Sequence, residues 1–212
     1  DLRIKGADAI IGDRAFGTTP EPIAHLGRAA MEGLMAGGVA PIIKHIPGHG
    51  RAKADSHLEL PVVPEEHGLL SETDFAPFKA LNDAPMAMTA HIVYADIDDS
   101  APATQSREVV EKVIRGEIGF DGLLMTDDLS MKALDGTFRE RGERSLKAGC
   151  DMLLHCNGDM AEMKAVAEGA ARLDGKRLER AEAAAAVRGT IEEFDPQDAE
   201  SRLNALLEPV TG

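Results

Sequence analysis

The sequence predicts an α/β fold built on parallel strands, and two observations lead to that prediction. Short apolar stretches alternate along the chain with stretches that carry helix signals, which is typical of parallel sheets with right-handed crossovers. The polar residues suited to chemistry come directly after the apolar stretches, as the active face of a (β/α)8 barrel or a doubly wound sheet requires. No GxGxxG or GxxxxGK[ST] phosphate loop follows these stretches, which disfavours the nucleotide-binding versions.

The first elements follow from local signals. Residues 2–4, Leu-Arg-Ile, resemble the end of a strand. Thr19 is placed as a helix N-cap with Pro20 at the first helical position, and Gly37 follows the end of the helix. The apolar residues expected to face the core of this helix are Ile23, Leu26, Ala30 and Leu34. The apolar run at residues 39–43 then predicts a buried strand.

The middle of the chain repeats the alternation. Ser71 and Asp74 open a predicted helix that runs to about residue 82. The apolar run 84–90 is a strand that ends at His91, and a helix is expected over residues 107–115.

A Gly-Phe-Asp-Gly turn at residues 119–122 precedes a strand at 123–127. Thr137 and Glu140 form a capping box that starts a helix, which Gly149 ends, and residues 151–154 form the next strand. The Ala-rich stretch 159–188 favours helix, and residues 189–212 are interpreted as a terminal helix and linker without chemistry.

Composition excludes several classes of protein. The chain has 212 residues, is 43% hydrophobic and is interpreted as one domain, residues 1–212. Its net charge of −14 disfavours binding to nucleic acid or anionic membranes. No apolar stretch approaches the ~18 residues that span a bilayer, so no membrane partner is expected. Cys150 and Cys156 indicate no disulfide framework, which favours a reducing compartment and a cytoplasmic location.

The richest polar segment is Lys44-His45-Ile46-Pro47-Gly48-His49-Gly50, followed closely by Asp55-Ser56-His57. Asp55 is placed to orient His57 and make it more basic, which suits a general acid/base, although the triplet also fits an Asx-turn with an exposed histidine. Asp127 ends a buried strand, where an isolated carboxylate is costly unless it is paired or catalytic. Asp128 is expected to point to the opposite face of that strand.

The segments 44–50 and 55–57, together with Thr126-Asp127-Asp128-Leu129-Ser130-Met131, resemble the bacterial β-N-acetylglucosaminidases of glycoside hydrolase family 3. Three further segments resemble that family in the same order: residues 12–17, 90–94 and 148–152. The resemblance covers nearly all of residues 1–160. It departs from the family at Thr126, where serine is usual.

The resemblance implies a single-domain (β/α)8 barrel that removes N-acetylglucosamine from 1,6-anhydro-N-acetylmuramic acid muropeptides in cell-wall recycling. Asp127 would be the nucleophile of a retaining mechanism. His57, on a mobile loop after the fifth strand of the family's barrel, would be the general acid/base with Asp55 as its partner. The resemblance places Arg14, Lys44 and His45 on the hydroxyls of the sugar. It implies no cofactor and no metal, a small sugar or muropeptide as the only partner, and a monomer when the protein is full length.

Two other functions remain open at this point. A metal-dependent hydrolase on a barrel is one, with His45, His49, Asp55, His57, His91 and Asp127 as candidate ligands. Against it, the sequence has no HExxH or similarly compact ligand pair, and Lys44 would repel a cation. A truncated, inactive barrel is the other. The strands counted correspond to about strands 4–8 of the eight that a barrel needs, so we expect an N-terminally truncated barrel.

Overall fold

A computed structural model gives the structure of the protein and describes residues 1–189, 191 and 193–207. The chain folds around a four-stranded sheet in which all neighbouring strands are parallel. In spatial order the strands are β1 (Ile42–Ile46), β3 (Met86–Thr89), β5 (Leu123–Asp128) and β6 (Met152–Leu154). The predicted α/β class and parallel sheet are therefore confirmed.

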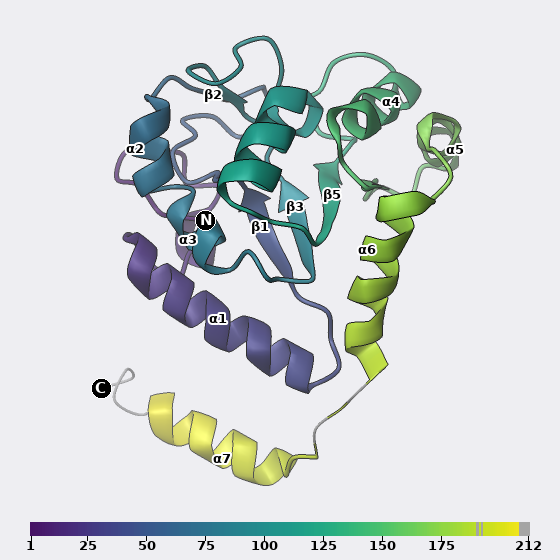
Figure 1. The fold of residues 1–212 in the computed structure, drawn as a ribbon. Helices are drawn as coiled ribbons and strands as arrows, with labels where there is room; N and C mark the ends of the chain where they lie inside the picture. Colours follow the sequence, from purple (N-terminus) through teal and green to yellow (C-terminus); the bar gives the residue numbers. More distant parts are fainter. Residues whose placement is uncertain (190, 192, 208–212) are drawn as a thin grey trace.

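Helices cover the sheet, and β2, a strand of a small second sheet, lies beyond the carboxyl ends of the main strands (Figure 1). The longer helices are α1 (Pro20–Ala36), η3 (Val109–Glu117), α4 (Phe138–Ala148), α5 (Met160–Gly169), α6 (Gly175–Ala186) and α7 (Pro196–Leu207). The short ones are η1 (Gly12–Arg14), α2 (His67–Glu72), α3 (Ala76–Ala80), η2 (Ala103–Gln105) and η4 (Val187–Gly189). The second sheet pairs β2 (Val62–Val63) with β4 (Val93–Tyr94) in parallel. Helix α7 buries no residue and lies apart from the sheet in Figure 1.

Several helix ends lie where local signals placed them. Helix α1 begins at Pro20 and ends before Gly37, as predicted. The Thr137 side chain accepts a hydrogen bond from the backbone N–H of Glu140, whose carboxylate accepts in turn from the backbone of Thr137. Gly149 ends α4 with φ at 120°, a conformation that other residues rarely adopt. These ends were predictable because each depends on residues within one helical turn.

Two predicted elements in the first half are wrong. Residues 2–4 form no strand, and the backbone N–H of Arg3 donates instead to the carbonyl of Gly17. The single helix expected over 71–82 is two short helices, α2 and α3, interrupted around Asp74. The Asp74 carboxylate is buried and binds Arg51 Nε at 2.6 Å, so it anchors a loop rather than capping a helix.

Two other boundaries differ because tertiary contacts set them. Strand β1 begins at Ile42 rather than residue 39 and includes Lys44 and His45, since its backbone pairs with β3 beyond the apolar run. The Ala-rich stretch is helical as predicted, and it is divided into two helices, α5 and α6. Helix α5 ends at Gly169, where a Cβ atom would lie 2.4 Å from the carbonyl oxygen of Arg139 in α4.

The main core lies between β3, β5 and the helices that cover them. Its large side chains include Phe75, Phe78, Tyr94, Ile114, Phe120 and Leu124. A smaller core of Leu129, Leu134 and Val166 lies beneath α4 and α5. Leu26 and Leu34 of α1, expected in the core, are 45% and 46% exposed. In the part of the chain that the structure describes, no helix is both long and apolar enough to cross a membrane.

Candidate active site

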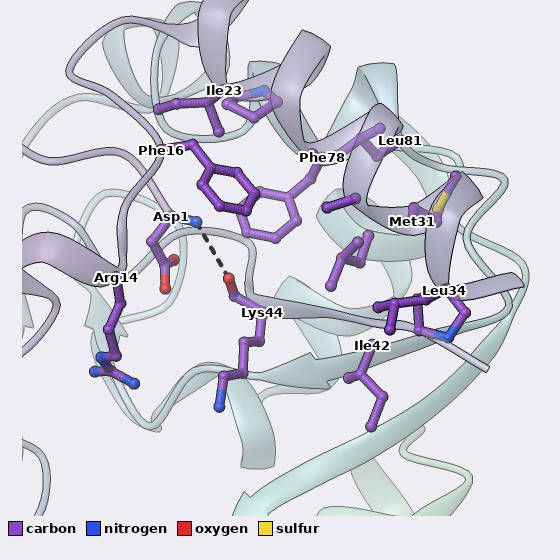
Figure 2. A pocket seen from close by; sticks show the side chains of 15 residues that line it. Asp1, Arg14, Phe16, Ile23, Met31, Leu34, Ile42, Lys44, Phe78 and Leu81 are labelled. Carbon is purple, nitrogen blue, oxygen red and sulfur yellow. Dashed lines mark hydrogen bonds between the residues drawn. The ribbon is translucent and has the colours of Figure 1, made fainter. Parts of the chain in front are cut away.

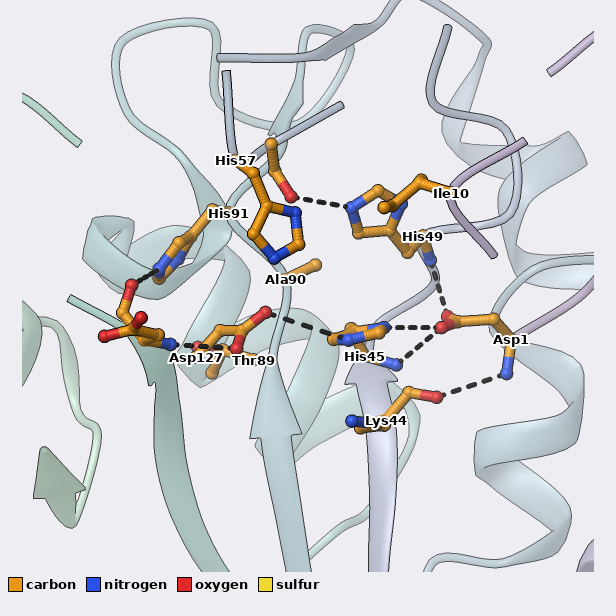
Figure 3. A network of polar contacts seen from close by, with 12 residues as sticks. Asp1, Ile10, Lys44, His45, His49, His57, Thr89, Ala90, His91 and Asp127 are labelled. Carbon is orange, nitrogen blue, oxygen red and sulfur yellow. Dashed lines mark hydrogen bonds and ion pairs between the residues drawn. The ribbon is translucent and has the colours of Figure 1, made fainter. Parts of the chain in front are cut away.

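A polar cleft of about 90 Å³ lies at the carboxyl end of the sheet, beside the residues that end β1 and β5 (Figure 3). Polar side chains converge on it, as they do in ligand sites. The residues that line it are Ile10, Ile11, Arg14, Lys44, His45, His49, Ser56, His57 and Asp127. Five of the six residues predicted from the sequence therefore meet here, and the sixth, Asp55, is bonded to His57.

His45 presents an unprotonated nitrogen to the cleft. Its Nδ1 lies 2.6 Å from Asp1 Oδ2, and Nδ1–H donates because a carboxylate only accepts. Burial lowers the pKa of His45 to about 3, although the Asp127 carboxylate opposes that shift. The ring is therefore neutral at neutral pH, and its Nε2 lone pair faces Asp127 Oδ2 at 3.7 Å. That nitrogen is suited to accept a hydrogen bond from a ligand hydroxyl.

Asp1 organises this wall of the cleft, and sequence reasoning missed it. One carboxylate oxygen accepts from both the backbone N–H and the ring of His45, and the other accepts from the backbone N–H of His49 at 2.7 Å. The partners lie 44 and 48 residues away along the chain. No local pattern marks such a residue.

The loop that follows β1 is held in place by contacts with distant segments of the chain. The hydroxyl of Tyr94, the only tyrosine in the chain, donates to the carbonyl of Gly48 at 2.6 Å. A Cβ atom at Gly50 would lie 1.4 Å from the carbonyl oxygen of Leu2, so only glycine fits there. Arg51 completes the attachment through its ion pair with Asp74. The glycines of the motif thus serve close backbone approach.

The two aspartates at the end of β5 point to different surroundings, as predicted. Asp127 Oδ1 accepts from the backbone N–H of Asp128 at 2.8 Å, which leaves Oδ2 facing the cleft. The Asp128 carboxylate instead accepts from the backbone and hydroxyl of Ser130 and from the backbone of Cys156. Burial acts to raise the pKa of Asp128, but these hydrogen bonds outweigh it and lower the pKa. Asp127 is the carboxylate available to a ligand.

His91 does not line the cleft but holds the strand that carries Asp127. Its Nε2 lies 3.1 Å from the carbonyl oxygen of Asp128, and its Nδ1 lies 2.7 Å from the hydroxyl of Thr104. The ring is fully buried, and burial lowers its pKa. His91 therefore acts as a neutral structural side chain.

The expected pair of Asp55 and His57 is present. Asp55 Oδ1 lies 2.7 Å from His57 Nδ1 and also accepts from the backbone N–H of His57, so an Asx-turn and an oriented imidazole occur together. The backbone hydrogen bond is the main cause of the lowered pKa of Asp55. Since Nδ1 is engaged, Nε2 is the atom of His57 that can exchange a proton with a ligand.

Arg14 reaches the same cleft from η1. One of its guanidinium nitrogens donates to the carbonyl of Ile10 at 2.6 Å. This bond fixes the orientation of the Arg14 guanidinium, and the other N–H groups of the guanidinium can donate to a bound ligand.

The six ligands considered for a metal site do not gather around one point. Among residues 1–189, 191 and 193–207, no group of three or more His, Cys, Asp and Glu side chains is placed to hold a metal ion. His91 is bound to a carbonyl and a hydroxyl, and His49 to the hydroxyl of Ser56. The arrangement favours acid/base and nucleophilic chemistry.

A larger hollow, about 250 Å³, lies between α1, α3 and β1 (Figure 2). Apolar side chains such as Phe16, Met31, Ile42 and Phe78 line most of it. Its polar lining residues are Asp1, Arg14 and Lys44, of which Arg14 and Lys44 also line the smaller cleft. His57 and Asp127 line the smaller cleft, so we assign the chemistry there.

The chain is similar to known proteins over most of its length. Residues 1–188 match the model of the "Glycosyl hydrolase family 3 N terminal domain". The chain is 43% identical over 157 residues to a β-hexosaminidase of Alkalilimnicola ehrlichii, covering 72% of this chain and 45% of the relative. It thus spans less than half the length of that curated relative.

Two solved structures of NagZ from Neisseria gonorrhoeae are also similar. The complex with N-trifluoroacetyl-D-glucosamine has a TM-score of 0.76 at 34% identity, covering 87% of this chain and 54% of the other. The complex with a zinc ion has a TM-score of 0.78 at 33% identity, covering 95% and 60%. The family match extends over most of the chain, and the motif residues meet in one cleft. The chain therefore belongs to glycosyl hydrolase family 3, and residues 1–188 correspond to the N-terminal domain of that family.

Proposed function

We propose that the protein is a retaining β-N-acetylhexosaminidase in which Asp127 is the nucleophile and His57 the general acid/base. The observation that carries the proposal is that the Asp127 carboxylate and the Asp55-oriented imidazole line one cleft. Two groups of this kind, one to attack and one to move a proton, are what retention of configuration requires. Here the proton donor is a histidine rather than the usual carboxylic acid.

The first step follows from the two oxygens of Asp127. Oδ2 faces the cleft and attacks the anomeric carbon while the bond to the leaving oxygen breaks, and His57 Nε2 gives its proton to that oxygen. Oδ1 keeps its hydrogen bond from the backbone N–H of Asp128. In the second step His57 takes a proton from water, which attacks the anomeric carbon and releases the carboxylate.

The other side chains of the cleft fit recognition of sugar hydroxyls. The lone pair of His45 Nε2 accepts from a hydroxyl, and Arg14 and Lys44 donate. A structural relative holds N-trifluoroacetyl-D-glucosamine, which supports N-acetylglucosamine as the sugar. We propose that the natural substrate is a muropeptide bearing 1,6-anhydro-N-acetylmuramic acid and that the protein acts in cytoplasmic cell-wall recycling, as a monomer when full length.

The same proposal extends to the fold. We infer that the four parallel strands are part of a (β/α)8 barrel, whose active face is the carboxyl end of the strands. Similarity to NagZ structures and the location of the cleft at that end support this inference.

Hydrolysis of a chromogenic N-acetyl-β-glucosaminide tests the proposal. We expect release of the chromophore and initial formation of the β-anomer of N-acetylglucosamine, followed by proton NMR before mutarotation. The corresponding β-glucoside should react far more slowly. Initial formation of the α-anomer would contradict a covalent intermediate on Asp127. Absence of hydrolysis both by the 212-residue chain and by the same chain placed after the N-terminal part of the Alkalilimnicola ehrlichii relative would contradict the proposed function.

A further inference from the structure

Ser56 stands out in the loop that carries the proposed acid/base. Along residues 53–60 it is the one buried residue, at 2% exposure, whereas the His57 side chain is 60% exposed. The two leucines of the loop, Leu58 and Leu60, are also exposed. No apolar side chain of residues 53–60 is buried in the core to anchor the loop. Ser56 is therefore the point at which this segment attaches to the rest of the protein.

Ser56 makes that attachment through two different segments. Its Oγ lies 3.1 Å from Nε2 of His49, in the loop after β1. Its carbonyl oxygen accepts from the backbone N–H of Ala133, after β5, at 3.3 Å. A buried hydroxyl is costly without a partner, so the bond to His49 accounts for a serine at this buried position.

His49 is itself buried and held by several contacts, so it can anchor Ser56. It is 3% exposed, its backbone N–H donates to Asp1, and its ring packs edge-on against His45 with 5.2 Å between centroids. The Asp1 carboxylate that holds His49 also holds His45. A continuous set of contacts thus joins the sugar-facing wall of the cleft to Ser56.

The residue after Ser56 is His57, whose ring lies over the gap between Asp127 and His45 in the view of Figure 3. The turn around it is closed by internal bonds, since the carbonyl of Asp55 accepts from Leu58 and Glu59. These bonds hold the turn together internally, so its position relative to the cleft depends on the attachment at Ser56. A displacement of about 1 Å in a catalytic group is enough to cost about a hundredfold in rate.

We propose that Ser56 is a positioning residue for the acid/base: its bond to His49 holds the Asp55–His57 turn over the cleft. This inference rests on the proposed function and adds a residue that the catalytic motif does not explain. Ser56 touches no reacting atom in this account. It acts through the location of His57 Nε2.

The test uses the leaving-group dependence of the rate, which a merely structural role would not alter. Ser56→Ala is measured on aryl N-acetyl-β-glucosaminides that range from activated nitrophenols to poorly activated phenols. We expect a loss of tenfold to about a hundredfold on poor leaving groups and less than about threefold on activated ones, because the latter need no proton. Ser56→Thr, which keeps the hydroxyl, should retain most of the rate.

His57→Ala and Ser71→Ala are run beside these variants. His57→Ala should show the same pattern more strongly. Ser71 is the matched control, since its hydroxyl binds Glu117 away from the cleft, and its loss should affect all substrates equally. Each variant is checked by thermal unfolding.

An unchanged rate for Ser56→Ala, or an equal loss on all leaving groups, would overturn the positioning role while His57→Ala still supports the acid/base. If His57→Ala lost the same fraction of the rate on all leaving groups, the acid/base assignment would be overturned, and the positioning role with it.

Discussion

At the scale of single residues, the nucleophile assignment depends on which of two adjacent carboxylates faces the cleft. Asp127 Oδ2 is open to a ligand, whereas Asp128 is held by Ser130 and Cys156. We predict that Asp127→Ala abolishes turnover and that Asp128→Ala costs much less. A 2-fluoro sugar should label Asp127, as mapped by mass spectrometry of the digested protein. Label on Asp128, or on neither, would rule out the assignment.

The burial of His49 predicts a pH dependence of stability. Its pKa falls to about 4 in the folded protein, against about 6.5 in the unfolded chain, because burial disfavours the charged ring. The unfolded chain therefore takes up a proton first as the pH falls below 6.5. The free energy of unfolding decreases through this range, and the loss is complete near pH 4. His45 contributes in the same direction.

His49→Gln isolates this contribution. Between pH 7.5 and pH 5, urea unfolding of the variant should lose on the order of 2 kcal/mol less stability than the unaltered protein. Equal losses in the two proteins would mean that His49 is not buried as a neutral ring.

Chelation separates the glycosidase from the metal-dependent alternative. The proposed chemistry uses Asp127 and His57 alone, so we predict that EDTA leaves the rate on a chromogenic substrate unchanged. A structural relative was solved with a zinc ion, which makes this measurement necessary. Loss of activity in EDTA with recovery in Zn²⁺ would replace the proposed mechanism by one in which a metal activates water.

At the scale of elements, two glycines in helices are predicted to respond in opposite ways to alanine. Gly169 ends α5 against α4, and a Cβ there would meet the Arg139 carbonyl oxygen at 2.4 Å. Backbone cannot move aside easily, so Gly169→Ala should destabilise the protein by about 1–3 kcal/mol. Gly33 lies within α1, and a Cβ there would meet nothing within 4 Å, so Gly33→Ala should stabilise by up to about 1 kcal/mol.

Thermal or urea unfolding measures both glycine variants. A stabilising effect of Gly169→Ala would show that α4 and α5 separate readily. In that case the break between α5 and α6 would need another cause.

At the scale of the whole molecule, the sheet ends in an edge strand beside an apolar hollow. Within the described residues, strand β1 pairs with β3 alone; Ile42 is 39% exposed, and Leu26 and Leu34 of α1 are also exposed. An open edge next to apolar surface favours pairing with another chain. We predict that the 212-residue chain alone self-associates and hydrolyses substrate poorly, as sedimentation and rate measurements would show.

Placing the N-terminal part of the Alkalilimnicola ehrlichii relative before Asp1 should then give a monomer with a higher rate. The reason is that added strands would cover the edge of β1. A monomeric, cooperatively unfolding 212-residue chain with ordinary hexosaminidase activity would contradict both the open-edge argument and the barrel inferred here.

The sequence alone determined the features that depend on neighbouring residues. The alternation of strands and helices, the start of α1 at Pro20 and the capping box at Thr137 all follow from contacts within a few positions. The motif segments also predicted the members of the cleft, because the carboxyl ends of parallel strands meet at one edge.

Only the tertiary structure decided how those members are held. Asp1 binds His45, which lies 44 residues away along the chain. Asp74, predicted to begin a helix, binds Arg51 instead. Strand β1 extends through His45 because it pairs with β3. Ser56 is buried for the same kind of reason, since its partner His49 lies in a different loop. Contacts between distant segments form only when the chain packs, and no local pattern encodes their partners.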